Sequence, residues 1–211
     1  MDIIEAGKAL IEEDLTFGTG GNLSERTKEG FRITPSGLAY EKMEEKDLVT
    51  MNEEGEVLKG IHRPSSEWEL HRQIYLHEKR AMAVIHTHSK YVNVLACTGR
   101  KLPAIHYLLA CVEGDSVDIA PYHTYGTKEL AEEALSSLHG KKAVILANHG
   151  LVTWGETIKE AFDIARTVEF CSFLYVEGLK IGNPVILSKE EMAKMVEKFK
   201  DYGPGKEIRK K

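Results

Sequence analysis

AMAVIHTH, residues 81–88, is an apolar run of strand length that ends in two histidines, and AVILANHG, residues 143–150, repeats the pattern with one. Short apolar runs of this kind predict buried strands. Because residues two apart on a strand share a face, His86 and His88 can point to one centre. His149 can supply a third imidazole and leave a fourth coordination position for substrate or water, as catalytic zinc sites do. The two runs therefore predict a metalloenzyme.

A structural interpretation competes with this one, because a single histidine at a strand end is usually a hydrogen-bonded core or rim residue. The His-x-His pair favours the metal. Gly150 adds to it, since glycine permits the tight turn that brings His149 toward the same centre. The other histidines lack this placement and are interpreted as structural: His62, His71, His77, His106, His123 and His139.

Length and composition predict a single domain over residues 1–211, without a shift that would mark a second one. The net charge of -5 argues against a nucleic-acid surface, which needs an excess of clustered lysine and arginine. The basic cluster at 206–211 lies in a segment, 203–211, that we expect to be a flexible tail.

Cysteine usage and the start of the chain predict a cytoplasmic protein. Cys97, Cys111 and Cys171 are odd in number and widely spaced among apolar residues, which is typical of reduced thiols. The acidic start lacks the basic and apolar segments of a leader, and no apolar stretch approaches the length of a membrane span. We therefore expect no membrane partner.

The order of expected elements predicts an α/β fold of three layers, α/β/α, around a mixed, mainly antiparallel central sheet. Hairpins interrupt the alternation of strands and helices, which argues against a doubly wound parallel sheet. Helices are expected at 2–14, 66–77, 89–97, 127–138, 156–177 and from 189, and strands at 31–34, 48–52, 56–58, 82–88, 117–120, 143–148 and 151–154.

The helix at 156–177 is apolar over a broad arc that includes Phe170, Phe173 and Leu174, and Gly178 is its expected end. Such an arc needs cover on more than one side, either from the chain's own sheet or from a neighbouring subunit.

Ser188 and Glu191 have the spacing of a capping box for the last helix.

The sequence Pro64-Ser65-Ser66-Glu67, at the start of the helix expected at 66–77, has two interpretations. Ser66 and Glu69 can form an ordinary capping box. Alternatively, the two serine hydroxyls, the free backbone N–H groups and the helix dipole suit a bound phosphate. Glu67 would then sit beside the anion and, close to a divalent cation, could act as a general base.

Two further turns, Gly20-Gly21-Asn22 and Ser36-Gly37, can bring backbone N–H groups close to an anion. Neither turn is specific alone, and the first is not a dinucleotide fingerprint, because it follows a helix, nor a nucleotide P-loop, because no lysine follows it. Three histidines, one carboxylate and three phosphate-suited turns together predict a small phosphorylated substrate.

These motifs, in this order, resemble the class II aldolase/adducin family, and within it the group of the L-fuculose-1-phosphate aldolases and ribulose-5-phosphate 4-epimerases. The resemblance runs from about Leu15 to Tyr202 through GTGGN (18–22), ITPSG (33–37), PSSE (64–67), HTH (86–88), PAIHY (103–107), APY (120–122) and NHG (148–150). It implies Zn²⁺, or another divalent metal, held by His86, His88 and His149. Glu67 would bind the metal while the site is empty and would then act as acid and base. The substrate phosphate would be held by Gly21, Asn22, Ser36, Gly37, Ser65 and Ser66.

Within the family, two departures favour an aldolase over an epimerase: the carboxylate is Glu67 rather than aspartate, and no His-Ala-Asp segment follows the metal histidines. The resemblance then implies that Tyr107 and Tyr202 are catalytic and that the chain forms homotetramers with sites between subunits. The expected reaction is reversible cleavage of a ketose 1-phosphate, such as L-fuculose 1-phosphate, to dihydroxyacetone phosphate and an aldehyde such as lactaldehyde.

Three alternatives stay open from the sequence: a pentulose-phosphate 4-epimerase, a methylthioribulose-phosphate dehydratase or aldolase, and a binding domain like the head of adducin. The binding domain is disfavoured, because the family resemblance implies that the head of adducin lacks the metal ligands that this chain keeps.

Overall fold

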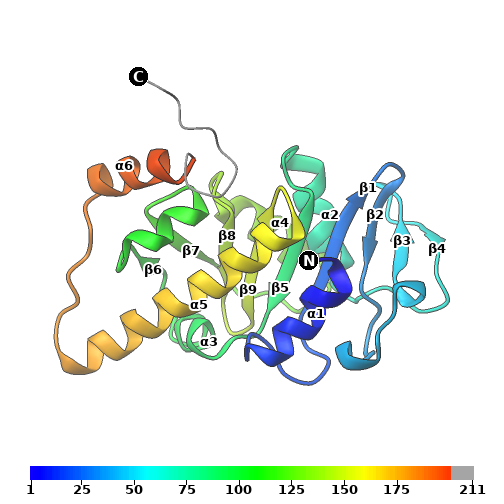
Figure 1. Cartoon of the computed structure of the whole chain (residues 1–211), viewed down its shortest axis with the longest axis horizontal. Helices are drawn as coiled ribbons and strands as arrows, with labels where there is room; N and C mark the ends of the chain where they lie inside the picture. The colour runs from blue at the N-terminus through cyan, green and yellow to red at the C-terminus, as the bar shows by residue number, and fades with distance from the viewer. Residues whose placement is uncertain (201–211) are drawn as a thin grey trace.

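A computed structural model describes residues 1–200, and Tyr202 and the segment 203–211 lie outside the described residues. In this part of the chain, nine strands form one sheet in the order β4-β3-β2-β1-β5-β9-β8-β7-β6 (Figure 1). Neighbouring strands run antiparallel, except that β7 and β8 are parallel. The strands are β1 Asn22–Thr27, β2 Gly30–Ile33, β3 Val49–Met51, β4 Val57–Lys59, β5 Ala83–Thr87, β6 Leu102–Pro103, β7 Ser116–Ala120, β8 Ala143–Leu146 and β9 Gly150–Gly155.

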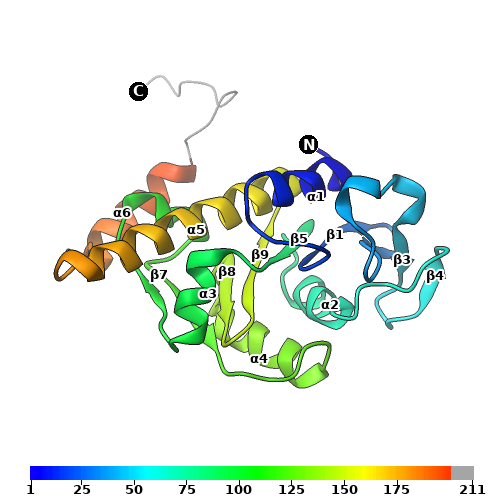
Figure 2. The ribbon, with the colours of Figure 1, turned by 90° about the horizontal axis from the view of Figure 1, so that it is seen from below.

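Helices cover both faces of the sheet (Figure 2). Helices α2 and α4 pack on one face, and α1, α3 and α5 pack on the other, with η3 and α6 beyond them. The helices are α1 Ile3–Glu12, α2 Trp68–His77, α3 Lys90–Cys97, α4 Lys128–Leu138, α5 Ile158–Ile181 and α6 Lys189–Lys200, with short 3-10 helices η1 Tyr40–Lys42, η2 Glu45–Asp47 and η3 Tyr107–Val112. The predicted three-layer fold with a mainly antiparallel sheet is confirmed. None of the helices within residues 1–200 combines the length and apolar character needed to cross a membrane.

Alternation along β8 shows how one strand serves both layers. Val144 and Leu146 are buried against α2 and α4, whereas Ala143 and Ile145 are buried against α3 and α5. This is the two-residue period of a strand covered on both faces, and it explains why the whole run is apolar.

Strand β5 lies at the centre of the sheet, between β1 and β9, and all five of its residues are buried. In the register, His86 is opposite Asn22 of β1 and Val152 of β9. The sequence NLSERT of β1 is polar, and no strand was predicted there. Cross-strand pairing with β5 overrides its weak β-propensity.

Three local predictions differ from the structure. The capping box of Ser66 and Glu69 is wrong: Glu67 is the N-cap of α2 and makes no capping bond, and Glu69 instead accepts hydrogen bonds from Arg72 and Gln73. Helix α5 does not end at Gly178 but continues to Ile181, since one glycine inside a helix costs only about 1 kcal/mol relative to alanine. Cys97 is exposed rather than packed among apolar residues.

The expected cap of α6 is present in one half. The Ser188 hydroxyl accepts a hydrogen bond from the backbone N–H of Glu191 at 3.2 Å.

Candidate metal centre

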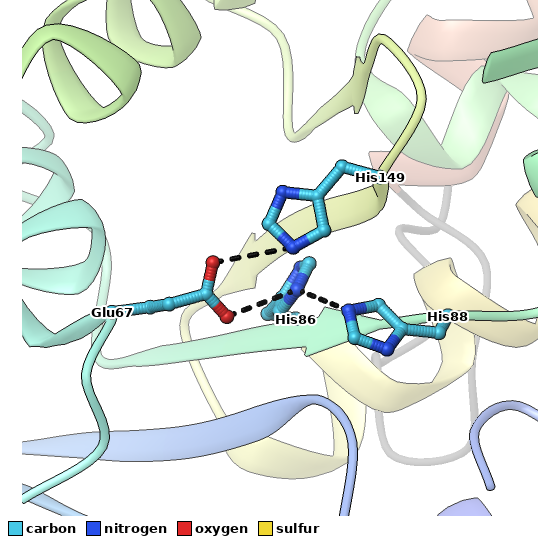
Figure 3. A group of neighbouring side chains, drawn as sticks. All are labelled: Glu67, His86, His88 and His149. Carbon is cyan, nitrogen blue, oxygen red and sulfur yellow. Dashed lines mark hydrogen bonds and ion pairs between the residues drawn. The ribbon is translucent and has the colours of Figure 1, made fainter. Parts of the chain in front are cut away.

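Three imidazoles converge at one end of the central strands (Figure 3). His86 lies in β5, His88 follows its end, and His149 lies in the turn between β8 and β9. The Nε2 atoms of His86 and His88 are 2.8 Å apart, and the ring centroids of His86 and His149 are 4.7 Å apart. The prediction that residues from two separate strand ends share one centre is confirmed.

Glu67, immediately before α2, completes the cluster from the opposite side. Its Oε2 is 3.2 Å from Nε2 of His86, and its Oε1 is 3.3 Å from Nε2 of His149. Candidate ligand atoms of all four residues lie within 4.8 Å of one another. Glu67 is only 6% exposed, and its Oε1 is buried and receives no hydrogen bond. A buried carboxylate oxygen without a donor, facing imidazole nitrogens, is an arrangement that a divalent cation satisfies, so the residues fit a metal.

The electrostatics keep the imidazoles neutral, which is the form that binds a metal. Burial lowers the pKa of His86 well below its ordinary value, and the neighbouring His88 and His149 lower it further. Burial also lowers the pKa of His88 and that of His149, while the Glu67 carboxylate opposes both shifts. The Nδ1–H of His86 donates to the backbone carbonyl of Leu151 at 2.9 Å, which leaves the Nε2 lone pair facing the cluster.

The backbone that presents His149 differs in one respect from expectation. The left-handed residue of the turn is Asn148, with φ of 55°, and not Gly150. Gly150 is needed for a close approach instead, because a Cβ there would lie 2.2 Å from the carbonyl oxygen of Thr87 and 2.9 Å from the ring of His88. Glycine thus lets β9 and β5 meet at the cluster.

Beside the cluster lies a cavity of about 370 Å³. Its lining includes all six residues predicted to hold a phosphate, which are Gly21, Asn22, Ser36, Gly37, Ser65 and Ser66, together with Glu67, His88 and His149. An isolated bridge between Pro35 and Pro64 holds two of the turns side by side. Gly21 requires its glycine, since φ is 70° and a Cβ would lie 2.5 Å from the carbonyl oxygen of His86.

Residues outside the predicted turns also line the cavity and were not identified from the sequence as site residues, among them Tyr122, His123, Tyr125 and Asn148. The first three follow β7, and Asn148 follows β8. Because β7 and β8 are parallel, their carboxyl ends meet at the same edge of the sheet. The interpretation of His123 as purely structural therefore needs correction to a residue of the cavity wall.

The two predicted catalytic tyrosines are not brought to this cavity by the described chain. Tyr107 begins η3, is 48% exposed and contacts the ring of His106, and it is absent from the cavity lining. Tyr202 lies outside the described residues. Their catalytic roles stay predictions.

The model of one protein family, described as the Class II Aldolase and Adducin N-terminal domain, matches residues 1–176. The chain belongs to this family. The resemblance drawn from the seven motifs is thereby confirmed.

Relatives of this class II aldolase family member carry the names of two kinds of aldolase. It is 42% identical to a 5-deoxy-D-ribulose 1-phosphate aldolase of Bacillus thuringiensis, over 96% of this chain and 95% of the relative. It is 39% identical to the L-fuculose phosphate aldolase of Escherichia coli K12, over 95% and 94% of the two chains. A solved structure of an L-fuculose 1-phosphate aldolase superposes with a TM-score of 0.91 at 45% identity, covering 94% of each chain.

Proposed function

We propose that this chain is a metal-dependent aldolase that reversibly cleaves a ketose 1-phosphate to dihydroxyacetone phosphate and an aldehyde. One observation carries the proposal: a carboxylate and three neutral imidazoles converge beside a cavity that three small-residue turns also line. The metal-binding group and the anion-suited turns lie within reach of one small ligand. Family membership adds independent support.

The chemistry of the cleavage explains each residue type. Breaking the bond between C3 and C4 leaves negative charge on the three-carbon fragment, and a divalent ion bound by His86, His88 and His149 would stabilise that charge as a Lewis acid. Glu67 moves the proton at C3, because its free Oε1 is the one oxygen of the carboxylate that accepts no hydrogen bond. The turns at Gly21, Ser36 and Ser65 hold the phosphate with backbone N–H groups and hydroxyls.

A separate acid must protonate the oxygen of the departing aldehyde, and we assign this role to Tyr107, with Tyr202 closing the site. Since Tyr107 does not line the cavity of its own chain, it acts in the site of a neighbouring subunit of a homotetramer. Phe170 and Phe173 on α5, which are 44% and 39% exposed, support such an assembly. We propose Zn²⁺ as the metal, because three imidazoles and one open position suit it.

The relatives suggest the class of substrate. The names of the relatives at 42% and 39% identity specify the 1-phosphates of 5-deoxyribulose and fuculose, both of which are ketoses with a terminal deoxy carbon. We therefore propose a terminally deoxygenated ketose 1-phosphate as substrate, with acetaldehyde or lactaldehyde as the second product. A methylthio sugar, named for another relative at 41% identity, is the alternative of the same class.

A product assay tests the proposal. Metal-free enzyme is reloaded with Zn²⁺ and offered L-fuculose 1-phosphate, 5-deoxyribulose 1-phosphate and L-ribulose 5-phosphate, and release of dihydroxyacetone phosphate is measured. We expect metal-dependent release from the 1-phosphates. Conversion of the 5-phosphate to its C4 epimer with the carbon skeleton intact, and no three-carbon product from any sugar, would overturn the aldolase in favour of the epimerase.

A further inference from the structure

Polar residues repeat along one face of β1 and along one face of α2, and the two repeats match in length. Asn22 and Ser24 are two residues apart on β1. Glu67, His71 and Tyr75 are spaced four residues apart, from the N-cap of α2 into the helix. Two strand residues advance about 6.7 Å and four helical residues about 6 Å, so the side chains can interleave. In the register, Asn22 lies opposite His86 and Ser24 opposite Val84, which places the β1 pair on the same sheet face as the metal histidine.

The side chains form one continuous chain of hydrogen bonds. Asn22 Nδ2 donates to Glu67 Oε2 at 2.9 Å, and the other amide atom, Oδ1, lies 2.5 Å from His71 Nε2. His71 Nδ1 lies 2.7 Å from Ser24 Oγ, which lies 2.7 Å from the Tyr75 hydroxyl. We call these five residues the α2–β1 hydrogen-bond chain.

The direction of every bond follows from the carboxylate. A carboxylate oxygen can only accept, so the Asn22 amide turns its nitrogen toward Glu67 and its oxygen toward His71. His71 must then donate from Nε2 and accept at Nδ1, which requires Ser24 to donate its hydroxyl proton and to accept from Tyr75. A reversed Asn22 amide would place its carbonyl oxygen against a carboxylate oxygen, and the two acceptors would repel each other.

The consequence for the cluster lies in the second oxygen of Glu67. The bond from Asn22 fixes Oε2, and Oε1 is left without a donor and facing His149. We propose that His71 is a positioning residue: by holding the Asn22 amide in one orientation, it keeps the Glu67 carboxylate aimed at the metal position. The earlier interpretation of His71 as purely structural is thereby extended.

Burial makes this chain rigid and keeps His71 in the required form. His71 and Ser24 are fully buried, Tyr75 is 2% exposed, and Asn22 is 4% exposed. Burial lowers the pKa of His71 to about 3, so its ring stays neutral with one donor and one acceptor. A satisfied buried network of this kind specifies a single arrangement, because each unpaired member would be costly.

A pair of substitutions separates the two ends of the ring. In His71→Gln the amide nitrogen takes the place of Nε2 and can still donate to Asn22, whereas in His71→Asn the side chain reaches only the position of Nδ1 and loses that bond. Gln73→Met is the matched control, since it removes one buried hydrogen bond, to Glu69, from the same helix without touching the chain of bonds. Zinc affinity is measured for each protein by competition with a chromophoric chelator, and folding by thermal unfolding.

We expect His71→Asn to lower zinc affinity at least about tenfold, as loss of a ligand-orienting group does. His71→Gln and Gln73→Met should stay within about threefold of the unsubstituted chain. The decisive measurement is a double-mutant cycle: in an Asn22→Ala background, His71→Asn should lower zinc affinity no further, because His71 acts through Asn22. Equal losses in the glutamine and asparagine variants, or full additivity with Asn22→Ala, would overturn the proposal.

The catalytic meaning of this inference rests on the proposed aldolase, but the zinc measurements do not. Absence of cleavage by the unsubstituted enzyme would remove the proposed function alone, and the cycle would still decide the role of His71. If cleavage is observed, kcat per zinc-loaded enzyme should equal that of the unsubstituted chain in His71→Gln. In His71→Asn it should be lower.

Discussion

Replacing Glu67 by glutamine preserves the size of the side chain but removes the only carboxylate in the cluster. The glutamine carbonyl can keep the bond from Asn22, which is 2.9 Å long, and its NH₂ group then occupies the position of Oε1, 3.3 Å from His149. That NH₂ group has no basic lone pair to accept the proton at C3. Loss of a general base costs about 10²- to 10⁴-fold in rate. We expect kcat to fall about 10³-fold, which corresponds to about 4 kcal/mol of transition-state stabilisation.

Folding should be little affected, because the hydrogen bond that the Glu67 side chain accepts from Asn22 survives. We expect the free energy of unfolding of the metal-free protein to change by less than about 1 kcal/mol. Steady-state cleavage is measured at saturating zinc, with bound metal determined on the same samples, so that weaker metal binding is not mistaken for slower chemistry. Glu69→Gln is the control, since it neutralises another buried carboxylate two residues away, in the first turn of α2, whose partners are Arg72 and Gln73. Zinc-loaded Glu67→Gln with a kcat within about tenfold of the parent would refute the assignment of Glu67 as base.

Three further predictions follow from the same geometry. His71 has a pKa of about 3 in the fold against about 6.5 when unfolded, so the unfolded chain binds the extra proton. His71 alone should therefore lower the stability of the metal-free protein as pH drops from 6.5 toward 3, by up to about 1.4 kcal/mol per pH unit. The lowered pKa values of His86, His88 and His149 add to the total slope, so urea unfolding at several pH values should show a slope for His71→Gln that is smaller by the share of His71. Gly150→Ala should prevent stable folding or sharply lower the melting temperature, since its Cβ would lie 2.2 Å from the Thr87 carbonyl oxygen. Gly182→Ala is the control and should leave the melting temperature unchanged, because a Cβ there meets nothing within 4 Å. Equal melting curves for the two variants would contradict the packing argument. Tyr107→Phe should lower kcat about 10²-fold without altering the melting temperature, and unchanged kcat would remove Tyr107 from the mechanism.

The parts of the fold that the sequence predicted are those with an uninterrupted physical signal. Strands β5 and β8 are buried on both faces, so β5 is apolar up to His86 and β8 is apolar throughout. The metal cluster was predictable for the same reason, because His86 and His88 share a face by the period of the strand. His149 required the assumption that two strands end at the same edge, which the pairing of β5 and β8 through β9 satisfies.

The parts that were missed are those where tertiary contacts override local preference. Strand β1 has the sequence NLSERT, and its polar inner residues, Asn22 and Ser24, carry no apolar alternation. Their partners come from a helix more than forty residues away, so nothing local marks them as buried. The wall formed by Tyr122 and Tyr125 was missed because its position depends on the parallel pairing of β7 and β8, which hairpin signals do not reveal.

The mismatch in β1 has a physical reason that connects fold and chemistry. A central strand gains most from apolar residues, and each buried polar side chain there must be fully paired to avoid a cost of about 1–3 kcal/mol. Asn22 and Ser24 meet that requirement only because α2 supplies Glu67, His71 and Tyr75 at matching intervals. An apolar pair at the two strand positions would suit the sheet, but it would leave Glu67 unanchored and the buried His71 and Tyr75 without these partners. The polar strand is therefore explained by the demands of the metal centre, and local disagreement between sequence and fold marks the place where a site is being held in position.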